Sequence, residues 1–120
     1  MVNIGINVTD LGGTFIKCNN LKVAPTIPEK VTNLGYTFQE CTNLKTVGTI
    51  PENIENMIWC FFKCHKLEGS IEINCNPSIY DDCFFECSTD ISGNLVLKGT
   101  SSLLDDLLST KSSNSKIVIE

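Results

Sequence analysis

One period constrains this chain more than any other feature: the same residue types return every 23 positions. The clearest columns consist of phenylalanine, cysteine, isoleucine and leucine: Phe15, Phe38, Phe61 and Phe84; Cys18, Cys41, Cys64 and Cys87; Ile4, Ile27, Ile50 and Ile73; Leu21, Leu44 and Leu67. They stay in register from Ile4 to about Thr89. A fixed period of about 20 to 50 residues is typical of stacked repeats, in which a single unit cannot bury its apolar face alone.

Each unit, called a rung below, predicts one strand. Apolar residues alternate from Leu21 to Ile27, and the counterparts are Leu44 to Ile50 and Leu67 to Ile73. This is the period of a strand that buries one face, and the prolines Pro28 and Pro51 end it because they lack an N–H donor. The alternation puts the remaining side chains on an outward face: Lys22, Ala24 and Thr26; Lys45, Val47 and Thr49; Glu68, Ser70 and Glu72; Ser92, Asn94 and Val96.

The same unit predicts a short helix after the strand. Between Thr32 and Cys41 the apolar positions Leu34, Phe38 and Cys41 lie four and three residues apart, as on one helical face. Parallel strands spaced roughly 4.8 Å apart, with helical turns behind them, describe an α/β leucine-rich-repeat solenoid. We expect about four full rungs, the sheet on the concave side, and short helices or turns on the convex side.

The register changes by one residue after Cys87, so that Leu67–Ile73 matches Ile91–Leu97 at a spacing of 24. A helix is expected from Thr100 to Thr110, with Ser102 and Asp105 as a capping box, and a last strand at 117–119. We interpret residues 98–120 as a C-terminal cap, residues 4–97 as the repeats, and residues 1–120 as a single domain.

The other end shows no comparable cap. Val2 to Asn7 is strand-like and in register with Pro25 to Lys30, so the first rung would leave an unpaired edge and bare apolar side chains. Two explanations stay open. The chain is the C-terminal piece of a longer protein, or a second copy covers the open rung by self-association.

The repeat unit resembles the BspA-like leucine-rich repeat of bacterial surface proteins. The resemblance rests on Val31-Thr32-Asn33-Leu34-x-x-Thr37-Phe38-x-x-Cys41-x-x-Leu44 and on Ile54-Glu55-Asn56-Met57-x-x-Cys60-Phe61-x-x-Cys64-x-x-Leu67. It covers about residues 4 to 97, although Pro77, Ile79 and Tyr80 depart from the pattern in the fourth copy. The resemblance implies a right-handed solenoid used for protein contact or host adhesion, without catalysis, and it carries over no binding residue.

Seven cysteines cannot all pair within one chain. Cys60, Cys64, Cys83 and Cys87 form two C-x-x-x-C pairs beside His65, a set that zinc could use. Against a metal site, the same column continues through Cys18 and Cys41, where Thr14 and Thr37 replace the second thiol. We therefore interpret the ladder as core packing, and leave open a disulfide between the adjacent rungs at Cys60 and Cys83.

Enzymatic chemistry has little support in the sequence. His65 is the single histidine, and no nucleophile elbow, phosphate-binding glycine loop or zinc-protease motif occurs. Asp81-Asp82 and Asp105-Asp106 are adjacent carboxylates that we interpret as solvated charges. We expect no catalytic, cofactor-binding or metal-binding residue and no cofactor.

The charge balance of nine basic and fourteen acidic side chains gives −5. Without a basic cluster, this argues against nucleic acid and anionic lipid as partners. The longest apolar run, Met57 to Phe62, has six residues, far short of the roughly 18 that suggest a membrane span. No secretion signal is recognisable from Val2 to Leu11.

Two surface features remain as candidates for contact. Lys17, Glu40, Lys63 and Glu86 form a column of alternating charge, whose main effect would be to fix the register of the rungs. Tyr36 and Trp59 share a column on the turn side, where they either cover neighbouring turns or form a lateral docking site.

The sequence thus favours a non-catalytic protein-binding or adhesion module, extracellular or displayed on the cell surface, with an unidentified protein partner. The alternative is a structural spacer or fibre segment, for example of a phage or a surface appendage, without a specific ligand. A thiol or metal-binding protein is a remote third interpretation.

Overall fold

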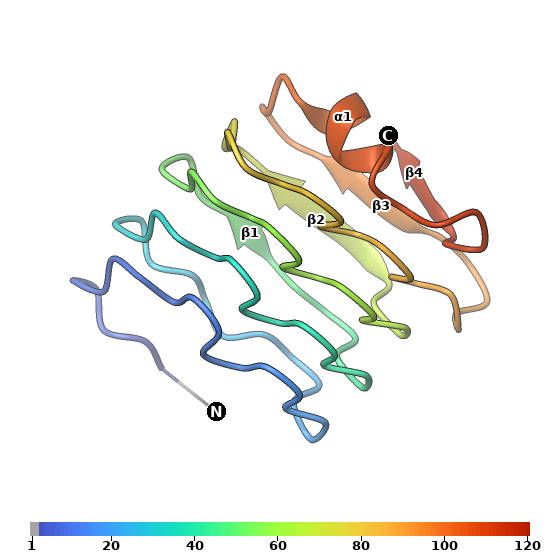
Figure 1. Ribbon diagram of the computed structural model, residues 1–120, viewed down its shortest axis with the longest axis horizontal. Helices are drawn as coiled ribbons and strands as arrows, with labels where there is room; N and C mark the ends of the chain where they lie inside the picture. Colours follow the sequence, from blue (N-terminus) through green and yellow to red (C-terminus); the bar gives the residue numbers. More distant parts are fainter. Residues whose placement is uncertain (1–2) are drawn as a thin grey trace.

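The chain winds into stacked rungs whose strand segments lie side by side (Figure 1). The computed structural model describes residues 3–120, which extend over 37 × 32 × 20 Å. Four strands form one parallel sheet in the order β1-β2-β3-β4, with the bounds Thr49–Ile50, Gly69–Ile73, Leu95–Lys98 and Ile117–Ile119. Sequential parallel strands joined by long returns are what a repeat solenoid requires. At this level the predicted fold class is confirmed.

The strands weaken toward the N-terminus, where Figure 1 shows coil in place of arrows. The segment Leu21–Ile27 joins the next rung through a single bridge, Val23 to Thr46, and residues 3–7 contain no strand. Pro25 supplies no N–H to the ladder, so pairing stops directly after Ala24 donates to Thr46. The predictions of strands at Leu21–Ile27 and at the N-terminus are therefore wrong, except that Val2 lies outside the described residues.

The turn side contains consecutive turns instead of the short helix predicted from Thr32 to Cys41. Tyr36 and Glu40 have φ values of 60° and 57°, and left-handed residues cannot continue a right-handed helix. Alternate N–H groups donate across the rungs instead, as Leu34 does to the carbonyl of Asn56 at 2.8 Å. Hydrogen bonds between rungs thus replace the bonds that a helix would make within one rung.

The fourth rung is longer than its sequence match suggested. The sheet pairs Gly69 with Leu95 and Ile71 with Leu97, a spacing of 26 residues, so the predicted spacing of 24 is wrong. Both spacings are even-numbered and bury the same strand face, because side chains alternate with a period of two. The hydrophobic pattern therefore cannot distinguish these two registers.

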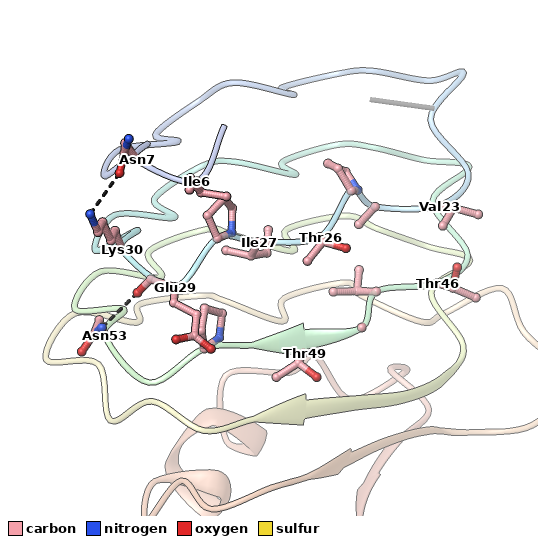
Figure 2. A pocket seen from close by; sticks show the side chains of 16 residues that line it. Ile6, Asn7, Val23, Thr26, Ile27, Glu29, Lys30, Thr46, Thr49 and Asn53 are labelled. Carbon is pink, nitrogen blue, oxygen red and sulfur yellow. Dashed lines mark hydrogen bonds between the residues drawn. The ribbon is translucent and has the colours of Figure 1, made fainter. Parts of the chain in front are cut away.

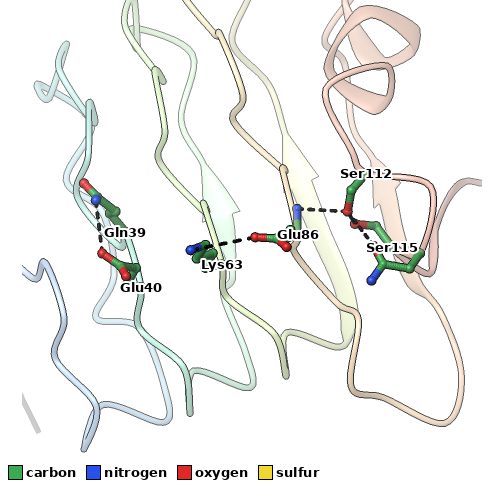
Figure 3. Close-up of polar contacts among 7 residues, drawn as sticks. Gln39, Glu40, Lys63, Glu86, Ser112 and Ser115 are labelled. Carbon is green, nitrogen blue, oxygen red and sulfur yellow. Dashed lines mark hydrogen bonds and ion pairs between the residues drawn. The ribbon is translucent and has the colours of Figure 1, made fainter.

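The C-terminal segment forms α1, Leu104–Leu108, followed by β4, which pairs with β3. The predicted capping box is wrong, since no side chain caps α1 and the hydroxyl of Ser102 donates to Asn76 Oδ1 at 3.0 Å. Beyond α1, two hydroxyls take the place of a following rung. The N–H of Phe84 donates to Thr110 Oγ1 at 3.0 Å. The N–H of Glu86 donates to Ser112 Oγ at 3.1 Å, the bond that Figure 3 shows.

The core consists of ladders that run from rung to rung. Parallel phenylalanine rings stack with centroids 5.6, 5.6 and 5.4 Å apart along the series Phe15, Phe38, Phe61 and Phe84. Beside them, the Cys41 thiol donates to the Phe15 carbonyl at 2.9 Å, and the Cys64 thiol donates to the Phe38 carbonyl at 3.0 Å. Cysteine suits this column because it is a small apolar side chain with a weak donor.

Candidate functional site

A groove of about 1080 Å³ opens on the strand side of the N-terminal rungs (Figure 2). We call it the strand-side groove. Its lining comes from the end of the first rung and from the next two strand segments, and is made of small apolar side chains, threonines and a polar rim: Ile6, Asn7, Val23, Ala24, Pro25, Thr26, Ile27, Pro28, Glu29, Lys30, Thr46, Val47, Gly48, Thr49, Pro51 and Asn53.

The groove lies where two sequence predictions about strand direction fail. Val23 was expected to point inward but is 63% exposed, and Val47 was expected on the outward face but is 4% exposed. Pro25 and Gly48 share a column with Ile71, a residue of β2. Proline and glycine weaken a strand, so the two N-terminal segments leave the regular alternation.

Backbone N–H groups that lack a hydrogen-bond acceptor contribute to the groove. Within residues 3–120, the N–H groups of Thr26 and Ile27 donate to no protein group. Two hydrogen bonds hold the rim: Lys30 Nζ donates to Asn7 Oδ1 at 3.0 Å, and Asn53 Nδ2 donates to the Glu29 carbonyl at 2.9 Å (Figure 2). The groove therefore combines a fixed rim with free hydrogen-bonding groups and exposed apolar surface, including Ile6 at 80% exposure.

An aromatic ridge follows the turn side and consists of Tyr36, Trp59, Phe62 and Phe85. Tyr36 lies 5.8 Å from Trp59 between ring centroids, as its column predicts. Trp59 stacks on Phe62 at 4.3 Å, and Phe62 stacks on Phe85 at 5.7 Å. Tyr36 and Phe85 keep 40% and 37% of their surface exposed. The ridge covers the turns and still presents two ring surfaces to solvent.

The charge column is only partly paired. Lys63 Nζ lies 3.9 Å from Glu86 Oε2 and 5.4 Å from the centroid of the Phe62 ring. Glu40 accepts a hydrogen bond from Gln39 at 3.2 Å, and within residues 3–120 Lys17 has no carboxylate within 4.0 Å. Figure 3 shows the one ion pair of the column. The predicted column of alternating charge thus contains a single exposed ion pair, which stabilises the fold by about 0–1 kcal/mol.

The cysteines carry free thiols, and all of them except Cys18 are buried. Burial raises the pKa of Cys41 and Cys75 to about 11 and that of Cys87 to about 12. Burial, followed by the neighbouring thiols, raises the pKa of Cys60, Cys64 and Cys83 well above the ordinary value. Because metal ligation and disulfide exchange both need the thiolate, this environment favours the packing role.

The candidate residues for metal or acid–base chemistry do not converge. Within residues 3–120, no cluster of three His, Cys, Asp or Glu side chains has the geometry to hold a metal ion. Cys60 and Cys83 occupy adjacent rungs as free thiols. His65 is half-buried, while both aspartate pairs, Asp81-Asp82 and Asp105-Asp106, are exposed.

The structure adds a polar ladder that the sequence analysis missed. The side-chain oxygens of Asp10, Asn33 and Asn56 each accept an N–H from two residues further on, at 2.8, 2.8 and 2.9 Å. Asn33 Nδ2 also donates to Asp10 Oδ1 at 3.0 Å. The signal was an Asx-turn residue at a fixed place in the repeat. It ends at the fourth rung, where Ile79 pairs with Asn56.

Comparison with known families agrees with these ladders. The family model of the BspA-type leucine-rich repeat region matches residues 2–105 in six copies, against the four full rungs expected from the columns. This chain belongs to the BspA-type leucine-rich repeat family. The resemblance seen in the repeat unit is therefore confirmed. Neither a curated protein nor a solved structure matches the chain.

Membership of the BspA-type family indicates a protein-interaction or surface repeat module. Leucine-rich repeats are generally non-catalytic, and BspA-type repeats are typically surface-associated. None of the described helices has the length and apolar character needed to cross a membrane.

Proposed function

We propose that this chain is a non-catalytic protein-binding module of a bacterial surface or secreted protein, and that the strand-side groove binds an extended segment of a protein partner. The observation that carries the proposal is the groove itself. Ligand sites are concave, apolar in lining and provided with a few placed polar groups. The groove has each of these properties, and the BspA-type match supports the protein-interaction class.

The lining indicates the chemistry of the segment. Small side chains such as Ala24, Val47 and Gly48 leave room for a backbone to approach closely, and an added Cβ at Gly48 would meet no atom within 4 Å. The free N–H groups of Thr26 and Ile27 suit the carbonyls of an extended chain. One glutamate and one lysine line the groove. We therefore expect a segment with small apolar side chains and little net charge.

Selection from a phage-displayed library of random peptides tests this function. Peptides enriched on the full chain are expected to lose about tenfold or more in affinity for the Val23→Asp variant, which places a charge in the apolar lining. Ser70→Arg, on the exposed part of β2 outside the groove, is the matched control and should leave the dissociation constant unchanged. Peptides that bind the Val23→Asp variant as tightly as the original chain would refute the groove as the site.

The spacer interpretation is supported by a different surface. Outside the groove, the exposed strand face carries Glu68, Ser70, Ser92 and Asn94, which lack the Trp, Tyr and Arg of typical hot spots. If repeated selections enrich no peptide that competes at the groove, a structural role without a specific ligand becomes the better account.

The proposal includes an extracellular or surface-displayed location. It draws support from the surface association typical of BspA-type repeats. Protease treatment of intact producing cells, followed by mass spectrometry of the released peptides, tests it. Release of peptides from this chain without release of cytosolic markers is the expected result, and protection until the cells are lysed would contradict it.

A further inference from the structure

The strand-side groove continues past the strand ends into a second, smaller hollow, which we call the strand-end hollow. It has a volume of about 310 Å³, and three residues line both it and the groove: Glu29, Thr49 and Pro51. The rest of its lining is polar and consists of Glu52, Asn74 and Thr100. Figure 2 shows the Glu29 side chain extending from the rim toward the end of β1. A segment that lies in the groove therefore has one end at the strand-end hollow.

Two carboxylates of like charge line the strand-end hollow. Glu29 and Glu52 are exposed and lie one 23-residue period apart, so they occupy one column on adjacent rungs. Like charges directly opposite each other on neighbouring strands are destabilising. Within residues 3–120 no lysine lies within 4.0 Å of either carboxylate, and Lys30 Nζ donates to Asn7 Oδ1 of the first rung, away from Glu52. The charge at this end of the groove is therefore uncompensated.

The donor set of the hollow suits a basic side chain better than a metal ion. Two carboxylates provide fewer oxygens than the six to eight that Ca²⁺ takes, and the amide of Asn74 is already engaged. Its Nδ2 donates to Glu72 Oε2 at 3.0 Å, and its Oδ1 accepts the N–H of Thr100 at 3.0 Å. A guanidinium presents five N–H donors in a planar fork, so one arginine can bond two neighbouring carboxylates at once.

We propose that the extended segment bound in the strand-side groove carries an arginine at the end that reaches the strand-end hollow, where Glu29 and Glu52 together bind its guanidinium. The inference rests on the proposed function, because the groove holds the rest of the segment. It adds one positive charge to a run of small apolar side chains. Charge-assisted hydrogen bonds are the stronger ones, so this contact also fixes which end of the segment lies beyond β1.

Phage-displayed random peptides that bind the full chain and are weakened by Val23→Asp provide the test, because that variant identifies them as groove binders. An arginine is expected at one end of their apolar run. Isothermal titration calorimetry of synthetic copies should show a loss of about tenfold or more in affinity for the Glu29→Gln/Glu52→Gln double variant. The matched control is Glu55→Gln, an exposed glutamate outside the groove and the hollow, which should leave the dissociation constant unchanged.

Replacing the peptide arginine by citrulline, its uncharged analogue, completes a double-mutant cycle. The replacement should weaken binding to the original chain by a similar factor and have no further effect on the double variant, because both changes remove the same contact. Groove-binding peptides that lack an arginine, or that bind the double variant as tightly as the original chain, would overturn this inference and leave the proposed function standing. Failure to select any groove-binding peptide would overturn both.

A measurement without peptide tests the electrostatic basis of the inference. Glu52→Gln removes one of the two like charges and should raise the melting temperature of the chain by about 1–4 °C at low salt, with a smaller rise in high salt. Glu55→Gln changes the net charge by the same amount, has Thr32 and Ser78 in its column, and should have no such effect. An unchanged or lower melting temperature for Glu52→Gln would show that its charge is already compensated, and would contradict the proposal.

Discussion

The N-terminal and C-terminal rungs are built on the same columns, yet the strands are longer than two residues only from β2 onward. The column that holds Ile71 in β2 holds Pro25 and Gly48 in the earlier rungs. Ile71 pairs with Leu97 of β3, whereas pairing of the first segment ends after Ala24. The residue type in this one column therefore distinguishes the hydrogen-bonded sheet at β2 and β3 from the strand-side groove.

The comparison also shows why the loss of pairing is tolerated. The turn side keeps four hydrogen bonds at each step in both halves, and the phenylalanine stack crosses them with nearly constant spacing. The backbone of the rungs is thus held from one side, while the strand side is free to vary. In a solenoid each rung contacts only its neighbours, so such a local change does not propagate.

Alkaline pH should produce the largest effect. The pKa of the Cys87 thiol is raised from 9.0 to about 12 by burial, and the pKa values of five other buried thiols are raised as well. The folded state holds protons that the unfolded chain releases, so this contribution to stability is complete below pH 9 and falls as the pH rises. Between pH 9 and its own raised pKa, each buried thiol lowers the free energy of unfolding by about 1.4 kcal/mol per pH unit.

Urea denaturation between pH 7 and pH 11 measures this loss. The Cys87→Ala variant is less stable at neutral pH because it leaves a cavity, but it should lose less stability between pH 9 and pH 11. A free energy of unfolding that stays constant up to pH 11 would show that the thiols are not buried as described.

Truncation of the stacked rings compares the two halves directly. Phe61→Ala, in the fully buried part of the stack, should lower the free energy of unfolding by about 3–5 kcal/mol. Phe15→Ala, in the half-buried first rung, should cost less than half as much, because its ring already meets solvent on one side. Equal losses in chemical denaturation would mean that the first rung is covered in solution.

The closing hydroxyls should give a smaller effect. Thr110→Val keeps the shape of the side chain but leaves the N–H of Phe84 without its acceptor, which costs about 1–2 kcal/mol. Thr14→Val, an exposed change in the first rung, is the matched control and should be nearly neutral. Thermal unfolding of both variants measures the difference. An unchanged melting temperature for Thr110→Val would show that the hydroxyl does not stabilise the C-terminal end of the stack.

The ion pair of the charge column should matter least. A double-mutant cycle with Lys63→Ala and Glu86→Ala is expected to give a coupling energy below about 1 kcal/mol that disappears in high salt, because both side chains are partly exposed. A coupling above about 2 kcal/mol would revive the view that alternating charge fixes the register of the rungs.

The sequence predicted what depends on burial at a fixed period. Phe38, Cys41 and Leu44 are fully buried as their columns indicated. It could not predict the turn conformation, because a spacing of four and three residues fits both a helix and a turn that contains left-handed residues. It could not separate spacings of 24 and 26, which bury the same strand face. The sequence did not reveal the groove, because the groove forms where Pro25 interrupts the hydrogen bonds between strands. In addition, Val23 is exposed and Val47 is buried, the reverse of what the alternation predicts.

The burial of the thiols determines when the cysteines can be oxidised. An oxidant reaches a cysteine as thiolate at an accessible surface, and six of the seven side chains meet neither condition once folding is complete. The native molecule can therefore pass from a reducing to an oxidising environment without forming disulfides in its core. The vulnerable period is the interval before the rungs stack, when all seven thiols are exposed together and wrong pairings would trap the chain.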